Sequence, residues 1–356
     1  MKSSILNKTL SIVSIVSCVI IMTSCGHSDM NKNESKNKEI HQTILNQKEL
    51  SPSDSKVIIE KNKNQEIPSF EDRDEYMAYI AELNDYKPHY KTVFRFENLS
   101  DLNMPTWQSN VVAMYNDIKE NFNYHIFKSQ PLYFVGDYNG EDKFLDGYID
   151  EDSGESTNLP QAFQPTKNKL VKPEKGKAYN LTVLKAFSMG ENIAQLFDKD
   201  VAEGRNFNAA DFKIDSIDEP ISIILGSSYE NIYKIGDILK FGDPDSMFNY
   251  KVIGFYKPGV GMVSDYASSQ EIIFNNYIIA PHYIPTYEPS NEAYGFEKDF
   301  QIGTLLDGNI YINEPIEKID DGLYESYKSK VIEIAKKHGL ENMINIARLP
   351  ADLRKR

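Results

Sequence analysis

The sequence predicts an α+β fold in which mixed β-sheets pack against helices. Two observations predict it. Amphipathic stripes at helical spacing stand near both ends of the aromatic-rich region, and short apolar runs bounded by turn residues fill the stretch between them. Strands that return through hairpins between helices are typical of α+β proteins rather than of a regular βαβ repeat.

The predicted helices have recognisable starts and stops. Ser69–Asp72 is a capping box, Thr106 is a second N-cap, and Gly339 is a usual helix stop. His338 lies on the last apolar stripe, so we expect it to pack at the helix end rather than to bind a ligand. The apolar faces are Met77–Leu83, Trp107–Phe122, Ile193–Phe197 and Leu323–His338.

Strands are predicted where β-branched and aromatic residues gather between turns. Asn139–Gly140 and Gly242–Ser246 are the clearest turns, and Ile221–Leu225 is apolar enough to be a buried strand that ends at Gly226. The predicted strands cover residues 90–96, 132–135, 144–149, 181–184, 221–225, 238–241, 250–256, 272–280 and 309–313.

Composition excludes several classes of protein. The 356 residues carry a net charge of −14 and a pI near 5.0, which argues against a nucleic-acid partner, since duplex binding needs clustered cations. Two cysteines supply neither a disulfide framework nor a Cys-based zinc site. Because 12% of the residues are aromatic, most of the chain is expected to fold.

The first 24 residues have the features of an export signal. Lys2 and Lys8 precede an apolar run, 10–22, that is short for a transmembrane helix. Met22–Cys25 resembles the bacterial lipobox, which implies that Cys25 is lipidated and becomes the first mature residue. Cys18 fits the pattern less well, because it would leave an apolar stretch on the mature protein. An uncleaved signal anchor is the alternative.

Residues 25–67 are predicted to be the lipidated cysteine followed by a flexible tether. The segment 26–66 has no Phe, Tyr or Trp and balances seven lysines against seven acids, so it cannot bury enough apolar area to fold. The folded body is expected to cover 68–356 and to hang from the extracytoplasmic face of the cell membrane.

Two segments of the body stand out by composition. Residues 137–155 hold eight carboxylates, and Asp150–Gly154 is faintly like a calcium loop, although it lacks the third ligand and the distant glutamate of an EF-hand. A solvated acidic loop is the favoured interpretation, and calcium binding stays open. Residues 158–178 hold three prolines and mark a loop or a subdomain boundary.

An ordered series of short motifs then supports a family resemblance. The motifs are Val201–Phe207, Asp211–Phe212, Pro220–Gly226, Tyr233–Leu239 and Tyr250–Phe255. In this order they resemble the MacB-like periplasmic core domain, the extracytoplasmic part of FtsX-type ABC transporter permeases. The resemblance implies an α+β domain of two subdomains. Its landmark residues in this chain are Gly204, Arg205, Phe207, Gly226, Gly236, Asp237 and Gly254.

The landmark residues are expected to have structural roles. Gly204 permits a tight turn, Gly226 ends a strand where a side chain would obstruct its neighbour, and Gly236–Asp237 turns the chain so that Ile238 enters the sheet. Gly254 is expected at a bulge. Arg205 could clamp a carboxylate or carbonyls of a partner, but a local salt bridge is favoured.

The resemblance implies a domain that transmits motion and contacts partners without bond chemistry. The expected partners are membrane lipid, through Cys25, and an ABC transporter permease and ATPase complex. The chain departs from the family pattern, because a lipoprotein signal stands in place of the first transmembrane helix and the sequence stops at Arg348–Arg356, near where the second would begin. The truncated extracytoplasmic part of a permease is therefore an alternative.

Two other functions were weighed. A solute-binding lipoprotein of an importer should show two similar α/β lobes, and no duplicated βαβ halves are found. An enzyme should show a catalytic motif, but H-E-x-x-H and G-x-S-x-G are absent and Ser53–Lys56 matches S-x-x-K inside the tether. His89, His125 and His282 lie far apart. No catalytic residue, cofactor or metal ligand is therefore predicted.

Overall fold

The computed structural model describes residues 106–148, 165–173, 176–263, 271–311, 321–344 and 346. The chain divides into two compact units after Lys63. Every described residue belongs to the second unit. Cys25, the tether, the predicted helix at Ser69, the strand 90–96 and the segment 149–164 lie outside the described residues, as does Arg348–Arg356. Within the described ranges, no helix has the length and apolar character needed to cross a bilayer.

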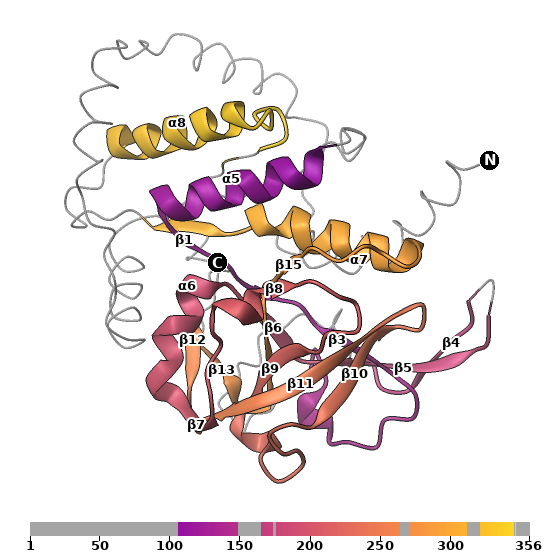
Figure 1. Ribbon diagram of the computed structural model, residues 1–356. Helices are drawn as coiled ribbons and strands as arrows, with labels where there is room; N and C mark the ends of the chain where they lie inside the picture. Colours follow the sequence, from indigo (N-terminus) through magenta and orange to yellow (C-terminus); the bar gives the residue numbers. More distant parts are fainter. Residues whose placement is uncertain are drawn as a thin grey trace, which may run out of the picture. The chain divides into compact units, whose positions relative to one another are not determined.

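A seven-stranded mixed sheet forms the centre of the fold (Figure 1). β11 pairs with β9 in parallel and β14 pairs with β6 in parallel, while the other pairings are antiparallel. The order is β10-β11-β9-β14-β6-β2, with β7 also paired to β11. The bounds are β2 Phe127–Ser129, β6 Ala186–Met189, β7 Val201–Gly204, β9 Ile221–Leu225, β10 Ile238–Asp243, β11 Ser246–Tyr256 and β14 Ile278–Pro281.

Smaller sheets surround the central one. β3 (Leu132–Val135), β5 (Tyr179–Leu184) and β4 (Lys169–Val171) form an antiparallel sheet that contacts β10 through β3. The remaining strands pair two by two. These pairs are β1 (Asn123–His125) with β16 (Asn309–Tyr311), β12 (Gly261–Val263) with β13 (Glu271–Ile273), and β15 (Ile284–Pro285) with β8 (Lys213–Ile214).

The longer helices pack together around their own core. α5 (Trp107–Asn121) contacts both α7 (Glu292–Gly303) and α8 (Asp321–Lys337), as Figure 1 shows. Val111, Met114 and Ile118 form the buried stripe of α5, three and four residues apart. α6 is short, Glu191–Ala194. The 3-10 helices are η2 Asp142–Phe144, η4 Gln195–Asp200, η5 Ala209–Phe212, η6 Ser227–Tyr229, η7 Phe274–Asn276 and η8 Thr304–Leu306.

β9 explains why the sheet is buried on both faces. Ile221, Ile223 and Leu225 enter one apolar core, and Ile224 enters the core on the opposite face. All four side chains are fully buried. A strand that is covered on both faces has a nearly continuous apolar sequence, as Ile221–Leu225 does.

The α+β prediction is confirmed. β3 and β9 have the predicted bounds, and α8 ends at the predicted place, where Gly339 adopts a φ of 68°. Thr106 occupies the N-cap of α5, but its side chain makes no capping bond, and instead the Ser109 hydroxyl donates to its carbonyl at 2.8 Å.

Two expectations about elements were wrong, and one helix was missed. The described part of the predicted strand 144–149, residues 144–148, is not a strand, because the chain turns through η2 and at Gly147, and only Leu145 bridges to Leu184. The run 272–280 is broken by η7 into two strands. α7 was missed, since Gly295 interrupts its pattern, although Asn291 is a true N-cap whose side chain accepts from the Tyr294 N–H at 3.0 Å.

Candidate functional site

Most of the landmark residues meet where β7 pairs with β11, although they are far apart in the sequence. Gly204 lies opposite Gly254 in the antiparallel register. The Arg205 N–H donates to the Ile253 carbonyl at 3.0 Å, and the Gly236 N–H donates to the Val252 carbonyl at 2.8 Å. We call residues 203–205, 235–238 and 252–254 the β7–β11 edge. Gly226 lies apart, against the carbonyl of Phe274.

Two glycines allow the close approach of β7 to β11. Gly204 has a φ of +86°, and a Cβ there would lie 2.2 Å from the Ile253 oxygen. At Gly254 a Cβ would lie 2.8 Å from the Arg205 oxygen. A side chain at either position would therefore push the two backbones apart.

The bulge expected at Gly254 is present. The register of β11 against β9 shifts between Val252 and Gly254. As a result Val252 and Phe255, three residues apart, enter the same core, while Ile253 enters the core on the other face.

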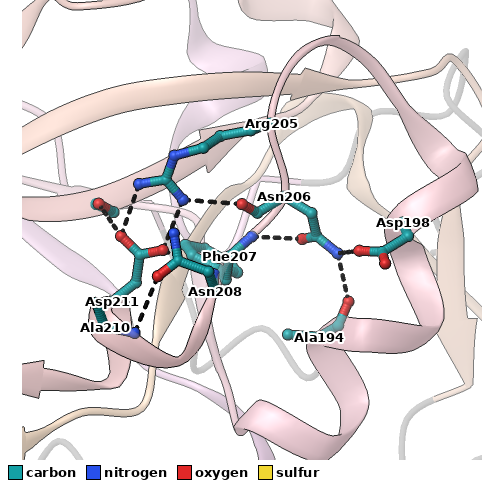
Figure 2. A network of polar contacts seen from close by, with 9 residues as sticks. Ala194, Asp198, Arg205, Asn206, Phe207, Asn208, Ala210 and Asp211 are labelled. Carbon is teal, nitrogen blue, oxygen red and sulfur yellow. Dashed lines mark hydrogen bonds and ion pairs between the residues drawn. The ribbon is translucent and has the colours of Figure 1, made fainter.

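The loop after β7 is held by an ion pair between Arg205 and Asp211 (Figure 2). The guanidinium donates twice, from Nη1 to Oδ2 at 2.6 Å and from Nη2 to Oδ1 at 2.9 Å. The Ser222 hydroxyl on β9 donates to the same carboxylate at 2.5 Å, which ties the loop to the central sheet. The local salt bridge favoured for Arg205 is thus formed, and the guanidinium is engaged within the chain.

Asp211 is kept ionised by these contacts. Its side chain is 7% exposed, and burial alone would raise its pKa. Arg205, the Asn208 N–H and the Ser222 hydroxyl outweigh that effect and lower the pKa below the ordinary value for aspartate.

Asn206 fixes the other side of the loop, a role that the sequence did not reveal. Figure 2 shows its amide between Ala194 and Asp198, with Nδ2 at 2.6 Å from both acceptor oxygens. Its Oδ1 accepts from the Phe207 N–H at 2.8 Å. Phe207 is thereby placed in the core, where its ring packs edge-on against Phe212. The one sequence signal here is the capping box that Asn208 and Asp211 form.

Exposed apolar side chains lie on the 235–238 segment of the β7–β11 edge and just before it. Ile232, Ile235 and Ile238, all within seven residues, are 48%, 43% and 48% exposed. We call these three the isoleucine patch. The Lys234–Asp237 turn holds it in place, because the Asp237 side chain accepts from the Lys234 N–H at 2.8 Å. Ile238 begins β10 as expected, but its side chain faces solvent instead of entering the sheet, because it lies on the outer face of the hairpin with β11.

A polar cluster around His282 is the arrangement that most resembles a catalytic group. The Ser188 hydroxyl is 3.2 Å from Nδ1 of His282, and the Thr304 hydroxyl is 3.4 Å from Nε2. Ser188 and His282 are fully buried, and burial, followed by the charge of Lys128, lowers the pKa of His282 well below its usual range. These contacts link Ser188 on β6 to Thr304 at the end of α7. They are better suited to a structural role than to binding a substrate.

The other histidines and acids are dispersed. His89 lies outside the described residues, His125 is buried in β1, and His338 contacts Asp117 with Nε2 at 2.7 Å from the carboxylate. Among the described residues, no three His, Cys, Asp or Glu side chains are placed to hold a metal ion. Asp150–Gly154 lies outside these ranges. Asp146 of the acidic segment is partly buried, which raises its pKa to about 6 against the opposing charge of Lys185.

Comparisons with known proteins give distant structural neighbours. No protein-family model and no curated protein match the chain. The extracellular domain of the noncanonic ABC-type transporter YknZ from Gram-positive bacteria aligns over 72% of this chain and 98% of that one, at 10% identity and a TM-score of 0.33. The periplasmic region of MacB from Actinobacillus actinomycetemcomitans aligns over 76% and 92%, at 12% identity and a TM-score of 0.31.

Proposed function

We propose that this protein is a lipid-anchored, extracytoplasmic and non-catalytic accessory domain of an ABC transporter, and that it contacts the transporter through the isoleucine patch. The observation that carries the proposal is the position of the patch. Three of the ordered motifs that resemble MacB-like core domains, Val201–Phe207, Tyr233–Leu239 and Tyr250–Phe255, meet at the β7–β11 edge, and two of the three exposed isoleucines, Ile235 and Ile238, lie on that edge.

The patch has the physical properties of a contact surface. Burying the exposed part of one isoleucine contributes about 1 kcal/mol, so three of them supply a useful fraction of a protein–protein affinity. Ile235 packs against Gly204, whose backbone is fixed by its pairing with Gly254. A surface that is already ordered loses little entropy on binding, which favours recognition without a large rearrangement.

The docking role is tested in cells by placing a photo-crosslinking amino acid at position 235. We expect crosslinks to an ABC transporter permease, identified by mass spectrometry. Ile235→Asp should reduce transporter co-purification at least tenfold, because it places a charge in a desolvated contact. Leu170→Asp is the matched control: Leu170 on β4 is 55% exposed and should tolerate the change.

The proposal also predicts what should not happen. Neither variant should unfold at the temperature of the experiment, since Leu170 is 55% exposed and Ile235, at 43% exposed, is not part of the buried core. Crosslinking to no membrane protein, or equal co-purification of the two aspartate variants, would rule out the patch as the docking surface.

A further inference from the structure

A directional chain of hydrogen bonds crosses from the central sheet to the end of α7. The Ser188 hydroxyl on β6 lies 3.2 Å from Nδ1 of His282, and the Thr304 hydroxyl lies 3.4 Å from Nε2 of the same ring. The Thr304 hydroxyl donates its proton to the Phe300 carbonyl at 2.8 Å. Its oxygen is therefore an acceptor for Nε2–H, and Nδ1 is left to accept from the Ser188 hydroxyl. We call Ser188, His282 and Thr304 the histidine joint.

The histidine joint is complete only while the imidazole is neutral. A protonated ring carries a hydrogen on Nδ1 as well, so the Ser188 hydroxyl could no longer donate to it and would have to turn. Ser188 and His282 are each 1% exposed, so the added charge would be buried away from water. A charge buried in this way is unfavourable unless a partner of opposite sign accompanies it.

The charge that faces the joint from the sheet is positive. Lys128 on β2 lies opposite Ser188 in the antiparallel register, so both side chains point to the same side of the sheet. The Lys128 ammonium lies 3.6 Å from the Asp307 carboxylate and 5.3 Å from the centre of the Phe300 ring. The Asp307 carboxylate is thereby engaged, and a second positive charge on His282 would be repelled by Lys128.

From this arrangement we propose that the histidine joint is an acid-sensitive switch, which releases the end of α7 and the adjoining η8 from β6 when His282 takes up a proton. The step is a protonation: one proton from water binds Nδ1, and only hydrogen bonds break. Once released, the imidazolium is solvated by water, so the charge that is unfavourable inside the joint is tolerated outside it. Neutral solution favours the closed form, and acidic solution favours the open one.

The pKa of His282 has the direction that the switch requires. Burial, followed by the charge of Lys128, lowers this pKa well below its usual range and outweighs the hydrogen bonds to the backbone of Gln301 and Thr304, which favour the protonated ring. The closed form therefore excludes a proton that the open form binds below about pH 6.5, the ordinary pKa of histidine. The stability of the closed form is unchanged above that value and falls as the pH decreases below it, until the folded pKa is reached.

The other ionisable groups around the joint do not produce the same response. β6 itself has no charged residue, and Lys128 and Asp307 face each other. On α7, Lys298 donates to a backbone carbonyl at 2.8 Å, and burial raises the pKa of Glu297. Protonation of Glu297 in acid therefore favours the folded state. A loss of α7 contacts on acidification has the opposite sign and is assigned to His282.

The test is hydrogen exchange of the full-length protein in detergent micelles, measured by mass spectrometry at pH 7.5 and at pH 5. After the chemical exchange rate at each pH is divided out, the amides of residues 302–307 give the equilibrium constant for opening of the joint. This constant should rise about thirtyfold at pH 5, because the open ring is then almost fully protonated while the closed ring is not. At pH 5 the same amides should open at least tenfold more readily than those of β9, which open only when the whole domain unfolds.

Two histidine variants assign the response to the joint. His282→Gln keeps an uncharged side chain that can donate and accept, but it does not titrate, so the opening constant should change less than threefold between the two pH values. His338→Gln removes a histidine just after α8 and should retain the full response. If His282→Gln does not fold, the comparison of residues 302–307 with β9 in the unchanged protein still decides between a local switch and global unfolding.

Three results would overturn the proposal: an opening constant that does not respond to pH, an equal response in His282→Gln and the unchanged protein, or equal opening constants for residues 302–307 and β9 at pH 5. The histidine joint and the isoleucine patch share no residue, so the crosslinking experiment at Ile235 is read independently of this test.

Discussion

Asp211 joins a surface loop to the central sheet through both of its carboxylate oxygens. Arg205 and the Asn208 N–H bind from the loop, and Ser222 binds from β9. An aspartate this buried is tolerated because every bond it makes favours the ionised form. The landmark arginine therefore acts as a support for the edge that carries the isoleucine patch.

Asp211→Asn should lower the free energy of unfolding at pH 7 by about 2 kcal/mol, since it removes a buried carboxylate that accepts hydrogen bonds from Arg205, the Asn208 N–H and Ser222. The pKa of Asp211 is lower in the folded state than in the unfolded chain, so its contribution is complete above the unfolded value and is lost as the pH falls through the folded value. Urea unfolding of the unchanged protein and of Asp211→Asn, over a pH series from 7 to 2, measures the free energy of unfolding at each pH.

The difference in unfolding free energy between the unchanged protein and Asp211→Asn should shrink as the pH falls. Asp218→Asn, at an exposed position, is the control and should change little at any pH. A difference that stays constant from neutral to acidic pH would contradict the assigned role of Asp211.

Gly226 and Gly295 test two opposite consequences of adding one methyl group. At Gly226 a Cβ would lie 1.8 Å from the Phe274 carbonyl oxygen, so Gly226→Ala should destabilise by about 2 kcal/mol or more. At Gly295, inside α7, the nearest atom is 3.9 Å away, so Gly295→Ala should stabilise by about 0.5–1 kcal/mol. Thermal unfolding of both variants should show shifts of opposite sign. Equal destabilisation would mean that the two environments do not differ as described.

Two helices far apart in the sequence are joined by one carboxylate. Asp117 on α5 contacts the Lys337 ammonium at 2.6 Å and Nε2 of His338 at 2.7 Å, at the C-terminal end of α8. The hydrogen bond from Lys337, followed by the one from His338, lowers the pKa of Asp117. Positive side chains at the end of α8 also suit the negative end of the helix dipole.

Asp117→Asn should lower the stability of the α5–α8 contact by about 1 kcal/mol, a value typical of a pair that water partly screens. Because the folded pKa is depressed, the effect should be present at pH 7, fade below the ordinary pKa of aspartate, and weaken in high salt. Hydrogen exchange of the α8 amides measures this loss of stability directly.

The control for this contact lies within α8 itself. Glu325 and Lys328 form a pair three residues apart, and Glu325→Gln should change exchange by only a few tenths of a kcal/mol. If Asp117→Asn and Glu325→Gln speed the amide exchange of α8 equally, the contact between Asp117 and the end of α8 does not stabilise the helix more than a pair on its own surface.

The proposed attachment to the membrane is tested at residues outside the described ranges. If Cys25 is lipidated as proposed, Cys25→Ala should abolish labelling with an alkyne fatty acid and release the protein into the medium. Cys18→Ala should leave both labelling and membrane retention unchanged. Membrane retention of Cys25→Ala with unaltered processing would instead support the uncleaved signal anchor.

Two outcomes distinguish the accounts of the whole molecule. A permease crosslinked at position 235 supports the accessory role. Capture of a stoichiometric small ligand without any transporter subunit would favour the solute-binding alternative, in which the domain presents a ligand to an importer.

The sequence alone determined the features that depend on a few neighbouring residues. The apolar run of β9, the stop of α8 at Gly339 and the bulge at Gly254 follow from side-chain periodicity and from the conformational freedom of glycine. The acidic net charge is an additive property that the composition alone gives, and the export signal is a prediction of the same local kind.

The tertiary structure decided everything that depends on pairing between distant segments. It placed β9 between β11 and β14, brought Gly204 opposite Gly254 and left Ile238 in solvent. Strand order and register are chosen by the burial of whole faces across many residues, and local propensity does not encode which distant segment supplies the partner. For that reason the seven landmark residues were found in the sequence, whereas the isoleucine patch became visible only in the folded chain.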